Sequence, residues 1–184
     1  MALKSTIFKA ELSIADIDRG YYRDHTLTVA RHPSETDERM MMRLLAFALY
    51  ADDALEFGRG LSAEHEPDLW RRDLTGTVEQ WIEVGLPEER EIRKACGRAR
   101  EVHVLAYGGR AVDPWWQGAR EKMERQERLT VSEVPVEASQ ALAQLAARQM
   151  RLQVTIQEGH VFVADDGTSV PVAIRLLKAP SNTR

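Results

Sequence analysis

Cysteine is almost absent from this chain of 184 residues, because Cys96 is the single one. An internal disulfide is therefore excluded, and the chain fits a reducing compartment. Long apolar runs are also missing, since the longest fall far short of the roughly 20 residues that a membrane-spanning helix needs. The first residues, Met-Ala-Leu-Lys-Ser-Thr, lack the apolar segment of a signal peptide. We therefore expect a cytoplasmic protein with no membrane partner.

Motifs for several kinds of chemistry are missing as well. The sequence has no glycine-rich phosphate-binding loop. The five histidines, at positions 25, 32, 65, 103 and 160, show no metal-ligand spacing, and Cys96 has no second cysteine for a zinc site. The formal net charge of −4 argues against a protein that coats nucleic acid non-specifically. An enzyme with a local basic groove stays compatible with that charge.

The apolar residues that are present suffice for one good core. They make up 43% of the chain, which at this length favours a single domain over residues 1–184. Residues 5–14 alternate between apolar and polar side chains, a turn follows at 16–20, and residues 21–30 alternate again. This pattern predicts a long antiparallel hairpin.

Helices and strands alternate in the middle of the chain. The segment after Ser34, a good N-cap residue, is apolar over much of its circumference and predicts a buried central helix to about Asp52. Residues 66–72 are expected to form a loop with a short turn. The further elements predicted here are a strand at 55–57, a strand at 77–85, a helix opened by Pro87 and a strand at 101–107. The last three form a crossover, which implies a parallel strand pair.

The C-terminal part continues this mixed pattern, so the predicted fold class is α/β. The adjacent Trp115 and Trp116 fit core or interface packing better than base stacking. The predicted elements are a helix opening near Asp113, a strand at 129–134, a helix at about 137–148, and strands at 152–156, 161–164 and 170–176.

Two carboxylates carry the strongest chemical signal. Asp68 follows Pro67, and Glu83 lies near the C-terminal end of the strand at 77–85, where open α/β sheets place their ligands. Such carboxylates can hold a hard divalent cation, which polarises a phosphate and lowers the pKa of a bound water. Each residue also has a plainer interpretation: Asp68 as part of a turn after proline, and Glu83 as a strand-end carboxylate reaching solvent. Glu79, on the same strand face, replaces Glu83 if the register is shifted.

Glu38 and Lys94 are weaker candidates. Glu38 heads the buried face of the central helix, where an acid needs a partner, or it is a first-turn acid favoured by the helix dipole. Lys94 lies on the helix after Glu83, well away from the centre of its apolar stripe, and its plainer role is to complement the dipole near the helix end. The position best placed for a lysine, two residues after Glu83, is Gly85.

Short runs over nearly the whole chain carry a family resemblance: 1–4 (Met-Ala-Leu-Lys), 30–36 (Ala-Arg-His-Pro-Ser-Glu-Thr), 38–41, 57–61 (Phe-Gly-Arg-Gly-Leu), 66–67, 81–83, 85–87, 94–96, 115–116 and 152–157. Through these runs the chain resembles the bacterial YaeQ family. That family is similar in fold to the PD-(D/E)XK nuclease superfamily, whose mixed four-stranded core sheet has the element order helix, three strands, helix, strand. The resemblance implies this core, flanked by helices, with the N-terminal β-hairpin and the C-terminal strands as additions.

The resemblance also implies roles for individual residues. Asp68 matches the metal-binding aspartate, Glu83 the second acid, and Glu38 the acid from the first core helix, so the implied cofactor is Mg²⁺, or Mn²⁺ in its place. Lys94 is the candidate for the lysine that is missing at Gly85. The implied function is a Mg²⁺-dependent nuclease that hydrolyses phosphodiesters of DNA or RNA. The alternative is a catalytically degenerate member of the fold that acts as a binding or regulatory protein.

Overall fold

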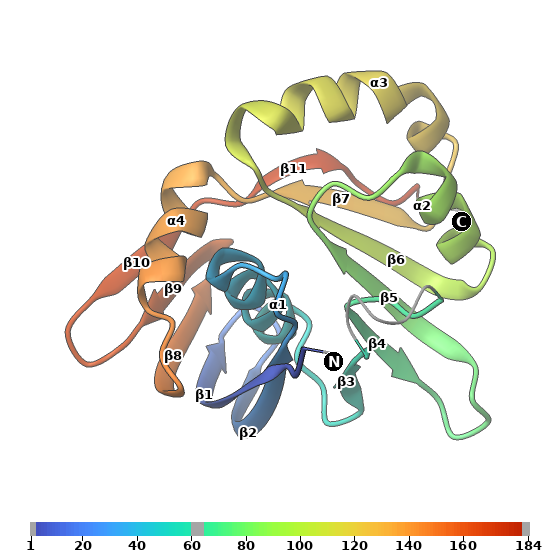
Figure 1. The fold of residues 1–184 in the computed structure, drawn as a ribbon. Helices are drawn as coiled ribbons and strands as arrows, with labels where there is room; N and C mark the ends of the chain where they lie inside the picture. Colours follow the sequence, from blue (N-terminus) through green and yellow to red (C-terminus); the bar gives the residue numbers. More distant parts are fainter. Residues whose placement is uncertain (1–2, 60–64, 182–184) are drawn as a thin grey trace. The chain divides into compact units, whose positions relative to one another are not determined.

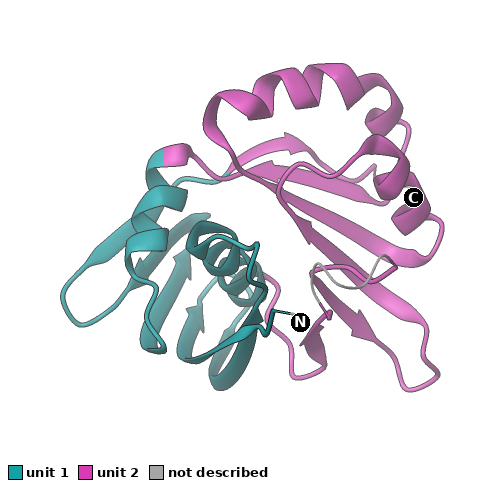
Figure 2. Cartoon of the chain, in the orientation of Figure 1, with its two compact units in different colours: residues 1–49, 137–174 teal, residues 50–136, 175–184 magenta. Residues whose placement is uncertain are grey.

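The fold was taken from a computed structural model that describes residues 3–59 and 65–181. The chain divides into two compact units: unit 1 comprises residues 1–49 and 137–174, and unit 2 comprises residues 50–136 and 175–184 (Figure 2). Each unit contains its own mixed sheet (Figure 1). No helix of the described residues is long and apolar enough to cross a membrane. That residues 1–184 behave as one domain stays a prediction.

Unit 1 is built on a five-stranded sheet in the order β10-β9-β8-β1-β2. β1 (Thr6–Asp16) and β2 (Tyr21–Arg31) form the antiparallel hairpin that the sequence predicts, and β8 (Gln149–Gln157) lies parallel to β1. β9 (His160–Ala164) and β10 (Ser169–Val172) continue the sheet as antiparallel strands. Because side chains alternate along β1, its buried face carries Phe8, Ala10, Leu12 and Ile14.

Two helices cover the apolar face of this sheet: α1 (Asp37–Leu49) and α4 (Val136–Gln144) (Figure 1). Apolar side chains of both helices meet those of the sheet, among them Leu12, Met41, Leu44, Leu45, Leu142, Leu152, Val154 and Val163. The first turn of α1 corrects one prediction, because Thr36 and not Ser34 is the N-cap. The Arg39 N–H donates to the Thr36 hydroxyl (3.1 Å), whereas the Ser34 hydroxyl is hydrogen-bonded to the His32 ring (2.7 Å).

Unit 2 is built on a six-stranded sheet in the order β11-β7-β6-β5-β4-β3. β3 (Leu55–Phe57), β4 (Leu69–Arg72) and β5 (Val78–Val84) are antiparallel neighbours. β6 (Ala99–Ala106) pairs in parallel with both β5 and β7 (Leu129–Glu133). The parallel β5–β6 pair confirms the crossover that the sequence predicts.

Two helices and one short strand complete unit 2. α2 (Glu89–Cys96) and α3 (Val112–Glu124) cover one face of the sheet (Figure 1), and a 3₁₀ turn at Gly109–Ala111 precedes α3. β11 (Arg175–Lys178) pairs antiparallel with β7 at the sheet edge. The core under the two helices includes Trp81, Ile92, Ala95, Val102, Val104, Trp116, Met123, Leu129 and Val131.

Three further element predictions are wrong in part. The segment 66–72 was predicted as a loop but contains β4, a strand of only four residues in which apolar and polar side chains do not alternate. The strand predicted at 170–176 is two strands, β10 and β11, which belong to different sheets. The helix predicted at 137–148 ends at Gln144. Of the runs that carry the family resemblance, residues 1–2 and 60–61 lie outside the described residues.

Candidate functional site

Asp68 is held at the C-terminal end of β5. It directly precedes β4, which runs antiparallel to β5 with Leu69 opposite Ile82. Its Oδ2 atom accepts a hydrogen bond from the Val84 N–H (2.8 Å), and its backbone carbonyl accepts one from the Gly58 N–H (2.9 Å). The residue is only 5% exposed. The aspartate after Pro67 therefore presents a buried carboxylate to the end of a neighbouring strand.

Glu83 lies beside Asp68 at the same strand end. Its Oε1 atom accepts a hydrogen bond from the indole N–H of Trp81 (2.8 Å). Burial is the main reason why the pKa of Glu83 rises from about 4.5 to about 8, and the charge of Asp68 is the next cause. A hydrogen bond to Asp68 and the charge of Glu91 on α2 act in the same direction, and the Trp81 bond opposes them. Glu83 therefore keeps a proton near neutral pH. Asp68 and Glu83 are called the acid pair below.

Two tryptophans and an arginine border the acid pair. Trp70 on β4 stands opposite Trp81 on β5, and their rings meet edge to face with centroids 6.1 Å apart. The guanidinium of Arg72 lies over the Trp70 ring, 4.5 Å from its centroid. Because side chains two residues apart on a strand share a face, Asp68 and Trp70 lie on the same side of the sheet.

Glu79 and Glu38, the other candidate acids, have different partners. Glu79 lies 3.2 Å from Arg100 and 4.0 Å from Arg71, so its charge is balanced by two arginines. Glu38 belongs to unit 1, where its Oε1 atom accepts a hydrogen bond from the hydroxyl of Ser139 on α4 (2.7 Å). Glu38 therefore has the partner that an acid on a buried helix face needs, and it links α1 to α4.

Lys94 is exposed on α2, on the side away from the buried Ile92 and Ala95. The position where a catalytic lysine would be best placed is occupied by Gly85, whose φ is +103°. A Cβ there would meet Tyr107 Cε1 at 3.9 Å, so space is available. The backbone conformation, which L side chains rarely adopt, is what favours glycine after β5. This gives a physical reason for the absence of lysine two residues after Glu83.

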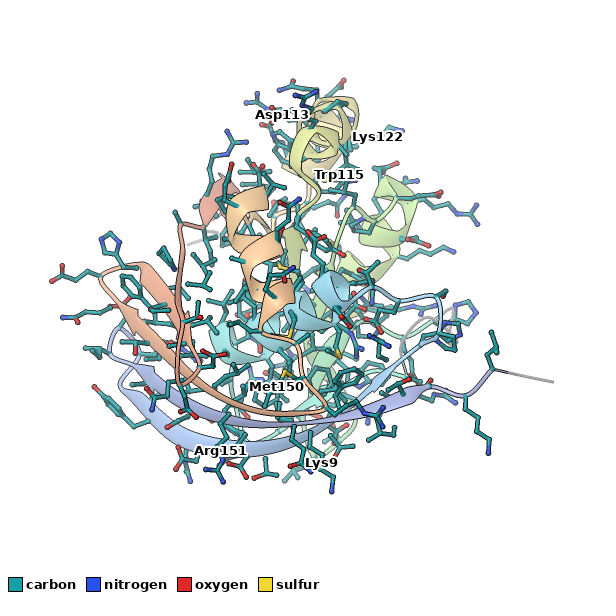
Figure 3. The ribbon with its side chains drawn as sticks, turned by 60° about the vertical axis from the view of Figure 1, so that its left-hand side comes forward. Lys9, Asp113, Trp115, Lys122, Met150 and Arg151 are labelled. Carbon is teal, nitrogen blue, oxygen red and sulfur yellow. The ribbon has the colours of Figure 1, made fainter. Side chains whose placement is uncertain are left out.

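The structure thus assembles a pair of acids in unit 2, and within the described residues no group of three or more His, Cys, Asp or Glu side chains could hold a metal ion. Sequence reasoning missed Trp70, Arg72 and Glu91 as neighbours of the acid pair. Trp70 and Arg72 follow Asp68 at two-residue intervals, and this spacing becomes informative once β4 is recognised as a strand. Trp115, on α3 (Figure 3), instead donates its indole N–H to the Pro87 carbonyl (2.8 Å), and Trp116 is buried in the core.

Sequence comparison assigns the chain to a family. The family model described as "YaeQ protein" matches residues 1–174. The chain is also 45% identical over 181 residues to the YaeQ protein of Escherichia coli (strain K12), which covers 98% of this chain and 100% of that protein. The chain belongs to the YaeQ family. The family resemblance that the sequence motifs indicated is therefore confirmed.

Solved YaeQ structures have the same fold. The YaeQ protein from Xanthomonas axonopodis pv. citri is 53% identical and superimposes with a TM-score of 0.93, covering 96% of this chain and 99% of that one. The YaeQ protein from Pseudomonas syringae is 38% identical with a TM-score of 0.91, covering 95% and 97% of the two chains. The mixed α/β architecture with two sheets is therefore the fold of these YaeQ proteins.

Proposed function

We propose that this member of the YaeQ family is a Mg²⁺-dependent phosphodiesterase that acts on nucleic acid, in the manner of PD-(D/E)XK nucleases. The observation that carries the proposal is the acid pair, in which a buried aspartate and a half-buried glutamate meet at the C-terminal end of β5. The element order supports it, because α1, β3, β4, β5, α2 and β6 follow one another as in the core of that superfamily. The parallel β5–β6 pair agrees with the same core.

The acid pair suits Mg²⁺. This ion keeps several waters and binds through one or two carboxylates together with substrate phosphates. Hydrogen bonds from Val84 and Trp81 hold one oxygen of each carboxylate, which fixes the orientation of the two groups. A bound ion supplies a polarised phosphate and a water of lowered pKa. Since the ion must displace the proton of Glu83, the affinity for the ion is expected to increase as the pH rises toward 8 and above.

Glu38 and Lys94 keep the roles that the family resemblance implies, as proposals. Glu38, which belongs to unit 1, would act as the acid of the first core helix, and it would have to exchange its hydrogen bond to Ser139 for that role. Lys94, whose side chain is exposed, would supply the positive charge that positions water or stabilises the developing phosphate charge. Neither role is needed for the acid pair itself to bind an ion.

A second function is favoured by one observation, the backbone at Gly85. Its φ of +103° disfavours a lysine at the position best suited to the chemistry. Positioning and charge stabilisation supply most of the catalysis in phosphoryl transfer, so losing this charge would be costly. The alternative is therefore a catalytically degenerate protein of this fold that binds nucleic acid or a regulatory partner without cleaving it.

The two functions are separated by assaying metal binding and cleavage in the same set of variants. The set is native protein, Asp68→Asn, Glu83→Gln, Lys94→Ala and, as a matched control on the same strand, Glu79→Gln. Millimolar Mg²⁺ or Mn²⁺ should raise the thermal midpoint of native protein and of Glu79→Gln, because the ion binds only the folded site. The increase should be largely lost in Asp68→Asn and Glu83→Gln.

Cleavage is measured on circular and linear DNA and on RNA with each metal. The nuclease proposal expects native protein and Glu79→Gln to cleave, and Asp68→Asn, Glu83→Gln and Lys94→Ala to be inactive. A thermal midpoint that Mg²⁺ or Mn²⁺ raises, with no cleavage of any substrate, supports the alternative function as a binding protein. Cleavage that persists unchanged in Glu83→Gln identifies a contaminating nuclease and removes the assignment.

A further inference from the structure

We infer that Trp70 and Arg72 form a stacking subsite for a base of single-stranded nucleic acid beside the acid pair. The inference rests on the proposed function, because it names the substrate class taken by the same site. It is carried by the stack of the Arg72 guanidinium on the Trp70 ring, with 4.5 Å between guanidinium carbon and ring centroid. This pair is called the Trp70–Arg72 stack below.

Trp70 anchors the stack on the protein core, whereas Arg72 is partly exposed to solvent. Trp70 is half-buried, packs against the core of unit 2, and meets the ring of Trp81 edge to face. Trp81 in turn donates its indole N–H to Glu83, so one aromatic pair connects the stack to the acid pair. The side chain of Arg72 is 45% exposed. The guanidinium of Arg72 is thus held over the anchored ring of Trp70, and much of the Arg72 side chain remains in solvent.

This arrangement fits an unstacked base. Proteins read single-stranded nucleic acid by stacking bases on aromatic rings or on guanidinium planes. Bases inside a duplex offer their faces to each other, so only a single strand can present a face to the stack. Asp68 and Trp70 are two strand residues apart, about 6–7 Å along β4. A base at the stack therefore places a neighbouring phosphate near the acid pair and the ion proposed there.

Negatively charged side chains lie near the stack, and they explain why a metal ion should strengthen the binding of nucleic acid. Glu56 lies 3.3 Å from Arg72, with its side chain 62% exposed, and the acid pair adds negative charge nearby. These carboxylates repel phosphate, and an ion on the acid pair offsets the repulsion. Glu56 also competes with the nucleic acid for Arg72. Removing its charge with Glu56→Gln should therefore tighten binding.

Binding is tested by fluorescence anisotropy with labelled dT and rU oligomers, in EDTA and in Ca²⁺, at low ionic strength where charge interactions are least screened. The informative variant is Arg72→Lys, which keeps the charge and loses the plane. It should bind both oligomers about 10-fold more weakly than native protein. Trp70→Leu should lose a similar factor, and Trp70→Phe should recover part of it. Arg125→Lys, at a matched exposed arginine directly after α3, should bind as native protein does.

The outcomes separate this inference from the proposed function. Arg72→Lys binding as tightly as native protein, equal affinity for a duplex of the same length, or no binding by native protein in either buffer overturns the stacking subsite. Losses on both oligomers support it, and a loss confined to dT or to rU also supports it and identifies DNA or RNA as the ligand. Failure of the proposed function appears elsewhere, as a thermal midpoint that Mg²⁺ leaves unchanged and as absence of cleavage.

Discussion

At the scale of single residues, Glu83 of the acid pair keeps a proton near neutral pH that an isolated glutamate would release. Glu83 binds this proton more tightly in the folded chain because burial and Asp68 raise its pKa to about 8, from about 4.5. The folded state therefore binds more protons than the unfolded state between these two pH values. The contribution of Glu83 to stability is fully present below about pH 4.5 and is lost as the pH rises through about 8.

This protonation predicts a pH-dependent difference between native protein and Glu83→Gln. Glutamine cannot titrate, so the unfolding free energy of native protein minus that of the variant should fall between pH 6 and pH 9. The expected fall is on the order of 2 kcal/mol, at about 1.4 kcal/mol per pKa unit. Urea unfolding of both proteins at several pH values measures it. A difference that stays constant over this range would show that the pKa of Glu83 is not raised in the folded protein.

Gly85 gives a second prediction at this scale. Its φ of +103° is costly for any residue with a Cβ, although space for one is available. Gly85→Ala should therefore lower the unfolding free energy by about 1–3 kcal/mol. Gly118→Ala is the control, because Gly118 is exposed inside α3 with nothing near its missing Cβ, and alanine should stabilise that helix by about 0.5–1 kcal/mol. Equal effects of the two changes in urea unfolding would contradict the backbone argument.

At the scale of elements, strong local patterns were predictable from the sequence and short or switching strands were not. The alternation in residues 5–14 and 21–30 correctly predicted β1 and β2. The β5–α2–β6 crossover was predicted from its strands and from Pro87, although α2 begins two residues after that proline, at Glu89. β4 was missed because it has only four residues, and its two apolar residues are adjacent instead of alternating with polar ones. β10 and β11 appeared as one strand, since the alternation of side chains cannot show that the chain changes sheets near Ile174.

The candidate site was predictable to a similar extent. The expectation that Asp68 and Glu83 hold one ion came from their positions, one after proline and one at a strand end, together with the family resemblance. Their neighbours were not predictable, because Trp70 and Arg72 join the site only through the pairing of β4 with β5. The partner of Glu38 is Ser139, 101 residues away in the sequence, and no local pattern connects them.

The start of α1 carries a prediction of this scale. Thr36 accepts the Arg39 N–H, which satisfies one of the donors left free at a helix N-terminus. Thr36→Ala should therefore cost about 1 kcal/mol of unfolding free energy. Ser34→Ala is the matched control and should cost less than about 0.5 kcal/mol, because its hydroxyl is exposed and bonds only to the His32 ring among its described contacts. If thermal or urea unfolding shows a larger loss of unfolding free energy for Ser34→Ala than for Thr36→Ala, Ser34 and not Thr36 is the N-cap.

At the scale of the whole molecule, the chain passes between the two units three times, at residues 49–50, 136–137 and 174–175. Neither unit is one continuous segment. β11 of unit 2 is joined to the rest of that unit only through residues 137–174, which belong to unit 1. When unit 1 unfolds, those residues become a long flexible connection, and closing it again costs conformational entropy. This connectivity favours cooperative unfolding, as the prediction of a single domain requires.

The four tryptophans make this cooperativity measurable. Trp70, Trp81, Trp115 and Trp116 all lie in unit 2, so tryptophan fluorescence reports on unit 2 alone. Leu12→Ala removes a side chain that is 2% exposed in unit 1 and should cost about 2–5 kcal/mol. In a single cooperative domain, this change lowers the urea midpoint by the same amount whether unfolding is followed by fluorescence or by far-ultraviolet circular dichroism.

Leu176→Ala, at an exposed leucine of unit 2, should leave both midpoints close to native. If Leu12→Ala leaves the fluorescence midpoint unchanged while circular dichroism shows a transition at lower urea concentration, the two units unfold separately.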